Sequence, residues 1–412
     1  MRGVAKAAER RLRELFCARF GEARGPLALA SAPGRVELAG NHTDHQGGCT
    51  ISAAIDRRAC ALAAPNGTDE ARVLMDGFGE ARIRLGDLGP REAEFGASSA
   101  LVRGMMAAYA RAGGRLRGFD LVTCSDIPVG LGVSSSAAFE MLVGAVIRAV
   151  CEPAPRASFD PTALALEGMR AEGAYFGKPS GAQDQLASAH GGVVALDFAD
   201  DPPQVSRLPL DLSSCGHAAF LVDCRCDHSR YTDEFNAVPA DMFAVARLLG
   251  ERRLQDVGYP ALLRSLADVR AKLGDRAALR AIHYFEEERR VRAQRRALEA
   301  GDFAAFLRLV RASGASSAQF LQNVSPRGDA AGGRQPAAVV LALCAHLLDG
   351  GSDGAERGAY RIHGGGFGGS VLAFAPQAKA EEFRRSMDGL LGYEACLPVV
   401  VSPQGACAER IA

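Results

Sequence analysis

The sequence predicts an α+β fold of two domains with mixed sheets. The chain has 412 residues, more than one compact core usually holds, and 48% of them are hydrophobic, which is enough for two cores. Short strand-like segments separated by glycine and proline fill much of the first half, whereas helical periodicity dominates the second half. We therefore expect domains at residues 1–200 and 201–412, with a polar, proline-bearing junction near 197–211.

The first domain is predicted to open with a helix. Its apolar residues Leu12, Leu15, Phe16 and Phe20 fall on one helical face, opposite arginines and glutamates. Strand-like segments follow, with the sequences LALASAPGRVELAG, TISAAID, CALAAP, ARIRL and FDLVTC. Two helical patterns, near 134–150 and 161–176, and a strand GGVVALDF complete this half.

The second domain is predicted to contain more helix than strand. Helical patterns cover residues 236–250, 260–273, 276–299, 302–314 and 335–349. Between and after them lie four strand-like segments, HAAFLVDC, YRIHGGG, SVLAFAP and LPVVVS. This order of elements favours a second mixed layer of sheet and helices.

Composition narrows the classes of partner. Lys+Arg and Asp+Glu balance at 48 each, which argues against a nucleic-acid-binding protein. The amino-terminal segment lacks an apolar signal core and no apolar run could span a bilayer, so we expect a cytoplasmic protein without a membrane partner. The eleven cysteines include no CxxC pair, which favours buried thiols in a reducing compartment over a metal or redox role.

A glycine-rich loop before a helix predicts a phosphate site. In SDIPVGLGVSSSAAFEMLVGAVIRAV, residues 125–150, Pro128 ends a strand, and Gly130 and Gly132 permit positive φ. Ser134, Ser135 and Ser136 then open an apolar helix, whose free N–H groups and positive dipole end suit phosphate. The structural alternative is a strand–turn–helix junction with serine N-caps. The loop matches neither the Walker A nor the protein-kinase pattern, so a different design of nucleotide site is indicated.

Four motifs, in order along nearly the whole chain, resemble those of the GHMP small-molecule kinase family, and within it most closely the galactokinase family. They are APGRVELAGNHTDHQGG, PVGLGVSSSAA, KPSGAQDQLASAHGG (178–192) and HGGGFGGSVLAF (363–374). The resemblance implies a two-domain GHMP kinase fold with the active site in the cleft between the domains. It also implies ATP and Mg²⁺ as cofactors. The choice of ATP rests on the resemblance alone, because no residue in the sequence identifies the nucleotide base.

Phosphoryl transfer needs a carboxylate that accepts or orients the hydroxyl proton and a positive charge near the migrating group. Asp184, among small residues in SGAQDQ, matches the family's catalytic aspartate, although a lone aspartate in a polar turn is usually a cap. Arg35, directly after Pro33 and Gly34, is the implied cation, which would keep Asp184 ionised and stabilise the phosphoryl charge. Its alternative is a surface arginine.

The resemblance also assigns the nucleotide and metal ligands. The triphosphate would be held by Pro128, Gly130, Gly132, Ser134, Ser135 and Ser136. Ser136 and Glu172 would bind Mg²⁺ through the hard oxygen atoms that this ion prefers, the alternative for Glu172 being a solvated helix glutamate. The third glycine motif, residues 364–369, would press its backbone against the phosphates or the sugar, unless it is only a tight hairpin.

The turn AGNHTDHQGG, residues 39–48, collects short hydrogen-bonding groups. A capped turn would explain Asp44 or Asn41 singly but not the whole set. By resemblance the turn binds sugar hydroxyls, and the implied substrate-binding residues are Asn41, His42, Asp44, Gly181 and Phe235. Buried hydrogen-bonding groups of this kind reject analogues that lack a matching hydroxyl.

Two residues depart from the galactokinase pattern. Asn41 stands where many galactokinases carry a glutamate that meets the C6 hydroxyl, and a neutral amide could bind a CH₂OH group or tolerate a carboxylate. Phe235 stands where the family usually has a sugar-contacting tyrosine, and one lost hydroxyl contact is worth about 1 kcal/mol. The segment DHQGG also resembles plant galacturonate kinases.

The implied activity is that of an ATP-dependent sugar 1-kinase acting on galactose. A kinase for a related sugar, galacturonate first, is the alternative substrate assignment. A non-catalytic galactokinase-like sugar sensor is the alternative from another class, but Arg35, Asp184 and the serine loop are all present. The expected partners are therefore a small-molecule sugar and ATP, and the expected state is a monomer or weak homodimer.

Overall fold

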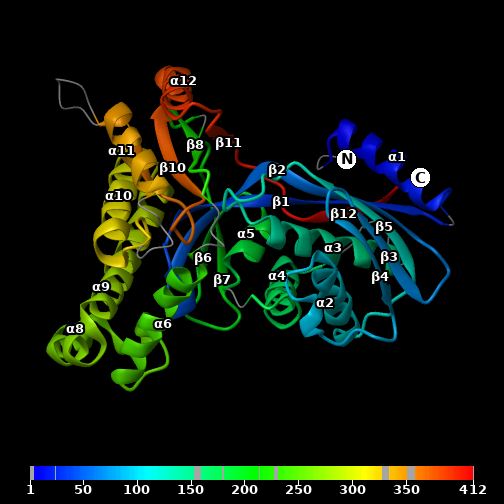
Figure 1. The fold of residues 1–412 in the computed structure, drawn as a ribbon, viewed down its shortest axis with the longest axis horizontal. Helices are drawn as coiled ribbons and strands as arrows, with labels where there is room; N and C mark the ends of the chain where they lie inside the picture. The colour runs from blue at the N-terminus through cyan, green and yellow to red at the C-terminus, as the bar shows by residue number, and fades with distance from the viewer. Residues whose placement is uncertain are drawn as a thin grey trace.

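The computed structural model describes residues 4–23, 25–152, 159–178, 181–212, 214–226, 231–326, 334–349 and 358–411. Two sheets organise these residues (Figure 1). The first contains β1 (Leu27–Ala39), β2 (Cys49–Pro65), β3 (Glu70–Met75), β4 (Gly79–Arg84), β5 (Phe119–Ser125), β6 (Val193–Asp197), β7 (Gln204–Leu208) and β12 (Cys407–Ile411). The second contains β8 (His217–Asp223), β9 (Ala359–Ile362), β10 (Ser370–Pro376) and β11 (Cys396–Val399).

Helices cover both sheets. The first half of the chain contributes α1 (Lys6–Phe20), α2 (Ser98–Arg111), α3 (Ser135–Cys151), α4 (Pro161–Ala171) and α5 (Gln183–His190). The second half contributes α6 (Thr232–Leu248), α7 (Leu254–Val257), α8 (Tyr259–Arg264), α9 (Leu266–Glu299), α10 (Phe303–Ser316), α11 (Pro336–Leu348) and α12 (Ala380–Leu391). The structure thus has the α+β architecture that the sequence predicts.

The first sheet is a layer between helices. Its order is β12-β1-β2-β5-β3-β4, and β6 and β7 extend it where the 17-residue β2 runs beyond β5. In Figure 1, α2, α3 and α4 lie on one face and α1 on the other. Leu12 and Phe16 of α1 pack on that second face because both apolar side chains point to the same side of the helix.

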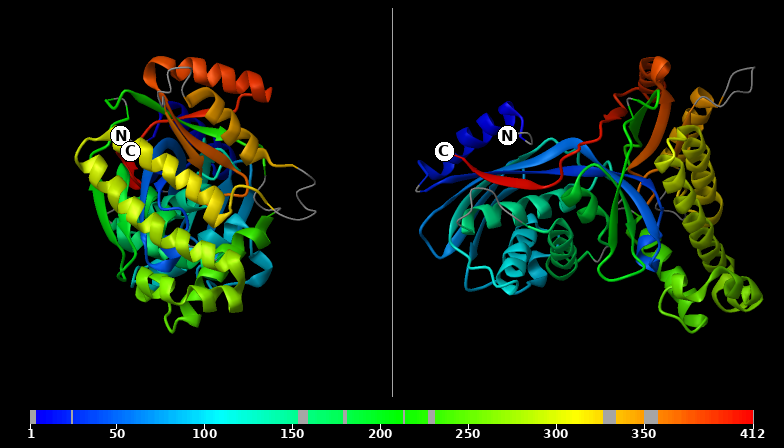
Figure 2. Two further views of the ribbon diagram at one scale, coloured as in Figure 1. Left: turned by 90° about the vertical axis from the view of Figure 1, so that its left-hand side faces the viewer. Right: turned by 180° about the vertical axis from the view of Figure 1, so that it is seen from behind.

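The second sheet, of order β11-β8-β10-β9, is buried on both faces. Its strands alternate, so Val222 and Val371 pack against α11 and α12, whereas Leu221 and Leu372 join the core that includes α10 and the first sheet. Figure 2 shows the long α9 and α10 beside this sheet. A continuous core therefore connects the two halves of the chain and fixes the loops between them.

Several local expectations are corrected by long-range pairing. The segments TISAAID and CALAAP form one continuous strand, β2, because each half of it pairs with β1 and with a further strand. The strand β7 lies inside the predicted junction, and β12 returns from the end of the chain to pair with β1. The helices α2 and α12 were not expected from the sequence. The division at residue 200 stays a prediction, although β7 and β12 both belong to the first sheet.

The cysteines are all free thiols. Within the described ranges, no group of three or more His, Cys, Asp or Glu side chains could hold a metal ion, and Cys224 and Cys226 belong to no such group. None of the helices in the described part of the chain is long and apolar enough to cross a membrane.

Candidate active site

Arg35 and Asp184 form an ion pair. Arg35 lies on β1 and contacts the Oδ1 atom of Asp184 with Nε at 2.7 Å and Nη2 at 2.6 Å. The other carboxylate oxygen, Oδ2, accepts a hydrogen bond from the Ser134 hydroxyl. The structure thus brings together the predicted cation, the predicted carboxylate and the first serine of the glycine loop.

These contacts keep Asp184 ionised. Burial acts to raise the pKa of this carboxyl, but the positive charge of Arg35, the hydrogen bond from Ser134 and the charge of Lys178 outweigh it and hold the pKa below its ordinary value. Asp184 is therefore a weak base, suited to orienting a hydroxyl and accepting its proton late in the reaction.

The glycine loop adopts the conformation that its sequence requires. Gly130 and Gly132 have φ of 87° and 76°, and Ser134 also lies in the left-handed region with φ of 57°. Arg35 donates through Nη1 to the Gly132 carbonyl at 2.5 Å, which ties the loop to β1. The helix α3 has no side-chain cap, because Ser134 turns toward Asp184 instead. The serine N-cap alternative is thereby excluded for Ser134, and the helix start keeps N–H groups for an anion.

Ser136 and Glu172 lie in hydrogen-bond contact. The Ser136 hydroxyl donates to Glu172 Oε1 at 3.0 Å, and Glu172 is only 2% exposed. Glu172 begins a single π-helical turn, η3 (Glu172–Phe176), at the end of α4. It is therefore a buried group facing the serine loop and not a solvated helix glutamate.

A second buried carboxyl, Glu140, lies behind Glu172. The amide of Gln185 bridges them, donating to Glu140 Oε2 at 2.9 Å and to Glu172 Oε2 at 3.2 Å. Burial, and then the nearby charge of Glu172, raise the pKa of Glu140 well above its ordinary value. The sequence contained a signal for Glu140, because this residue lies one helical turn after Ser136 on the same helix.

The turn of residues 40–48 contains Asp44 and His42, and it lies next to Gly181, three residues before Asp184. Gly181 lies so close to Asp44 that an added Cβ would come within 2.0 Å of Asp44 Oδ2, so only glycine fits there. Burial raises the pKa of Asp44 to about 6 and lowers the pKa of His42 to about 4, so His42 is neutral near pH 7. The His42 Nε2 atom lies 3.0 Å from the Gly365 carbonyl.

Asn41 lies deeper than its neighbours in the turn. It is completely buried, and its amide nitrogen donates to Glu37 Oε1 at 3.1 Å and to the Gly364 carbonyl. Its amide oxygen accepts from Asn323 Nδ2 at 2.7 Å. These bonds connect the turn to the third glycine motif. A sugar contact by Asn41 stays a prediction.

The third glycine motif packs against the turn of residues 40–48 and against Phe235. An added Cβ on Gly365 would come within 2.0 Å of the Phe235 ring, and that ring lies 5.5 Å from the His42 ring, centroid to centroid. Ser370, which follows the motif, donates to the Leu131 carbonyl in the phosphate loop at 2.7 Å. The motif therefore contacts both the turn of residues 40–48 and the glycine-rich loop before α3, which a simple hairpin would not do.

The sequence analysis missed a buried polar cluster below these residues. Arg361 is completely buried and donates to Glu37 Oε1 at 2.5 Å, while Gln183 donates to Glu37 Oε2 at 3.2 Å. The ring of His363 accepts from the Glu37 backbone N–H at 3.0 Å. The sequence contained a signal for this cluster. Alternate residues of a strand lie on the same face, so Glu37 is expected to share a face with Arg35, and His363 with Arg361.

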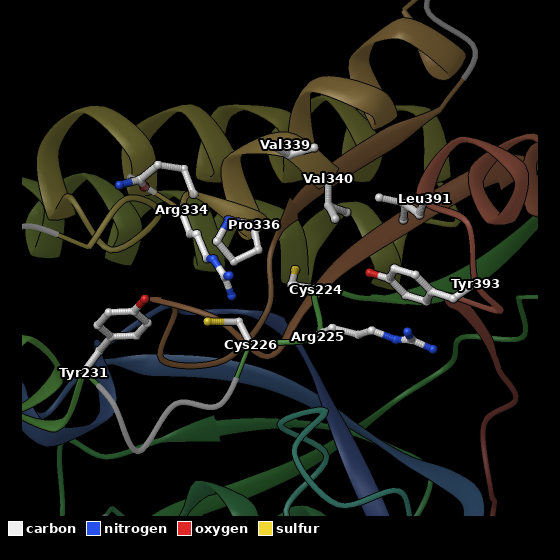
Figure 3. A pocket seen from close by; sticks show the side chains of 11 residues that line it. Cys224, Arg225, Cys226, Tyr231, Arg334, Pro336, Val339, Val340, Leu391 and Tyr393 are labelled. Atoms are coloured by element: carbon white, nitrogen blue, oxygen red, sulfur yellow. The ribbon is translucent and has the colours of Figure 1, made fainter. Parts of the chain in front are cut away.

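A cavity of about 620 Å³ is lined by residues of the second half of the chain and is shown in Figure 3. Its lining includes Arg225, whose guanidinium stacks on Tyr393 at 3.8 Å, together with residues of α11. Cys226 is also in the lining, and its backbone carbonyl accepts a hydrogen bond from the Gly369 N–H at 3.1 Å. None of the predicted site residues is among the described residues that line the cavity, although Cys226 connects it to the third glycine motif.

Two family models match the stretches of the chain that contain the turn of residues 40–48, the glycine-rich loop and Asp184. The galactokinase galactose-binding signature matches residues 14–65, and the GHMP kinases N terminal domain matches residues 96–192. Galactokinase from Streptomyces coelicolor is 30% identical over 93% of this chain and 92% of its own length. Galactokinase from Mycobacterium tuberculosis is 32% identical over 85% and 90%.

Solved structures agree on the fold. The Lactococcus lactis galactokinase complexed with galactose superposes with a TM-score of 0.78 at 23% identity, covering 97% of this chain and 99% of that one. Methanococcus jannaschii mevalonate kinase superposes with a TM-score of 0.60 at 14% identity, covering 94% and 100%.

Proposed function

The chain belongs to the galactokinase family of the GHMP kinases, and from this membership we propose that it transfers the γ-phosphoryl group of ATP to the C1 hydroxyl of galactose. It is a phosphotransferase with an alcohol group as acceptor. The observation that carries the proposal is the contact of Asp184 with both Arg35 and Ser134, because it joins a carboxylate, a cation and a phosphate loop at one point.

In this proposal Asp184 and Arg35 act on the reacting atoms. Asp184 orients the C1 hydroxyl and takes its proton as the bond to phosphorus forms, and the ADP oxygen leaves from the opposite side. Arg35 stabilises the negative charge that spreads over the transferring phosphoryl oxygens. Its guanidinium is buried and tied to the loop, so little reorganisation is needed during the step.

The nucleotide is assigned to the glycine and serine loop. The residues that would surround the triphosphate are Pro128, Gly130, Gly132, Ser134, Ser135 and Ser136. Ser136 and Glu172 fit a magnesium ion, because they present two hard oxygen donors 3.0 Å apart and leave the remaining positions for phosphates and water. Bound there, magnesium would neutralise charge on the triphosphate.

The sugar is assigned to the space bordered by Asp44, His42, Gly181 and Phe235, with Asn41 behind. Asp44, when ionised, can accept two sugar hydroxyls, and the neutral ring of His42 supports the turn through Gly365. Gly181 lets the Asp44 carboxylate approach the backbone closely, because a Cβ there would come within 2.0 Å of Asp44 Oδ2. Phe235 offers an apolar face at this position.

A coupled ADP-release assay with MgATP tests the proposal against galactose, galacturonate, N-acetylgalactosamine and glucose. We expect galactose to give the highest kcat/KM. Preference for galacturonate would instead make the neutral Asn41 the residue that admits a C6 carboxylate. Absence of turnover on all four sugars, with ATP and galactose still bound, would mean a sugar sensor.

The affinity for galactose is expected to fall at low pH. The pKa of Asp44 is about 6, so the carboxylate that accepts sugar hydroxyls becomes protonated as the pH falls through that value. The pKa of Asp184 is low, so the catalytic carboxylate stays ionised over the same range. At pH 5 the KM for galactose should be about tenfold higher than at pH 7.5, because about nine-tenths of Asp44 is then protonated. Asp44→Asn should remove this dependence, and a flat KM between pH 5 and 8 in the unmodified protein would contradict it.

A further inference from the structure

Lys178 provides a second positive charge at the site that the proposed mechanism leaves unused. Its ammonium lies 3.2 Å from Glu172 Oε1, the same oxygen that accepts the Ser136 hydroxyl. Lysine is rare in this chain, at positions 6, 178, 272 and 379 only, where arginine supplies nearly all the positive charge. A flexible point charge therefore stands at the carboxylate assigned to the metal.

The backbone fixes Lys178 beside this carboxylate. Gly177 adopts φ of 78° after the π-helical turn, and the Lys178 N–H donates to the Glu172 carbonyl at 3.2 Å. The Glu172 side chain is 3% exposed, whereas the Lys178 side chain is 56% exposed. The carboxylate is therefore held in place while the ammonium can move on its four-carbon stem.

The charges around Lys178 suggest where the ammonium can go. Burial acts to lower the pKa of Lys178, but the negative charges of Glu172 and then Asp184 outweigh it and raise that pKa. The charge of Lys178 in turn helps to lower the pKa of Asp184. The ammonium is therefore attracted both by the carboxylate assigned to the metal and by the carboxylate assigned to catalysis. The γ-phosphoryl group must pass through this region if Asp184 is to act on the sugar hydroxyl.

We propose that Lys178 pairs with Glu172 in the metal-free protein, yields that carboxylate when a metal binds, and then contacts the triphosphate as a second cation. This inference rests on the proposed function. A metal ion and an ammonium repel each other and cannot share Oε1, so the ammonium must leave. A bound triphosphate would offer the released ammonium a new anion, and a cation there would stabilise the transfer.

Manganese binding and turnover together test the exchange. We would measure free Mn²⁺ by electron paramagnetic resonance during titration of protein saturated with a non-hydrolysable ATP analogue, and kcat with MgATP and galactose. Lys178→Met is expected to bind Mn²⁺ about fivefold more tightly, because a competing half-exposed ion pair is gone. Its kcat should fall at least about tenfold, because the second cation is lost. Lys178→Arg should keep a kcat within about threefold of the unmodified protein.

Lys379 supplies a matched control. Its ammonium lies 3.6 Å from Glu382 and is 49% exposed, a similar lysine–glutamate pair on the surface of α12 and its approach. Lys379→Met should change neither Mn²⁺ affinity nor kcat. Unchanged or weaker Mn²⁺ binding by Lys178→Met would overturn the exchange, and unchanged kcat would overturn the contact with the triphosphate. If the unmodified protein binds nucleotide and Mn²⁺ but phosphorylates no sugar, the proposed function fails while the Mn²⁺ comparison still decides the exchange.

Discussion

Replacement of Asp184 by asparagine is expected to reduce kcat about a thousandfold, equivalent to about 4 kcal/mol in the transition state. The amide oxygen of an asparagine can still accept from Arg35, and its amide nitrogen can donate to the Ser134 hydroxyl once that hydroxyl rotates, so the geometry of the pair should survive. It cannot accept the hydroxyl proton or provide the negative charge that aligns the acceptor. Turnover should therefore fall while the Kd for MgATP, measured by calorimetry, stays within about threefold.

Asp120 provides a control for the loss of an aspartate–arginine pair. Its side chain is less exposed than that of Asp184, 9% against 32%, and contacts Arg72 at 2.5 Å, but it lies elsewhere in the first sheet, on β5. Asp120→Asn should leave kcat unchanged. Near-normal turnover by Asp184→Asn would remove Asp184 from the reaction, whatever its effect on stability.

Replacement of Arg361 by methionine is expected to lower the free energy of unfolding by about 3–5 kcal/mol. The guanidinium is completely buried between the second sheet and β1, and it balances the charge of Glu37 at 2.5 Å. Methionine fills most of the volume but leaves the Glu37 carboxylate buried without a cation. Among the described residues, the amide donors of Asn41 and Gln183 then remain beside it.

A double variant separates charge from packing in this experiment. Glu37→Gln combined with Arg361→Met removes both charges, so it should recover at least about 1 kcal/mol of the loss. Arg384→Met breaks an exposed pair with Glu381 and should cost less than about 1 kcal/mol. Unfolding by denaturant, followed by circular dichroism, measures all three. A loss below about 1 kcal/mol for Arg361→Met would show that the buried pair does not connect the two halves of the molecule.

Much of the candidate site could be predicted from the sequence because its motifs are local. The glycine loop carries its own conformational requirement, and the structure gives Gly130 and Gly132 the positive φ that such a loop needs. Arg35 and Asp184 could be paired in advance because both stand in motifs that resemble those of the family, and they lie 2.6 Å apart. The helix α1 also follows from periodicity, since its buried face requires only a spacing of three or four residues.

The sequence by itself thus determined the family, the α+β class and the residue types at the site. Only the tertiary structure decided which of those residues meet. Ser134 turned out to contact Asp184, fifty positions away, and Asn41 to bond Asn323 and Gly364. Lys178 and Arg361 acquired partners that no spacing predicted. The reason is physical: a hydrogen bond or ion pair depends on distances of a few ångströms, and those are fixed by strand pairing and core packing between segments far apart in the chain.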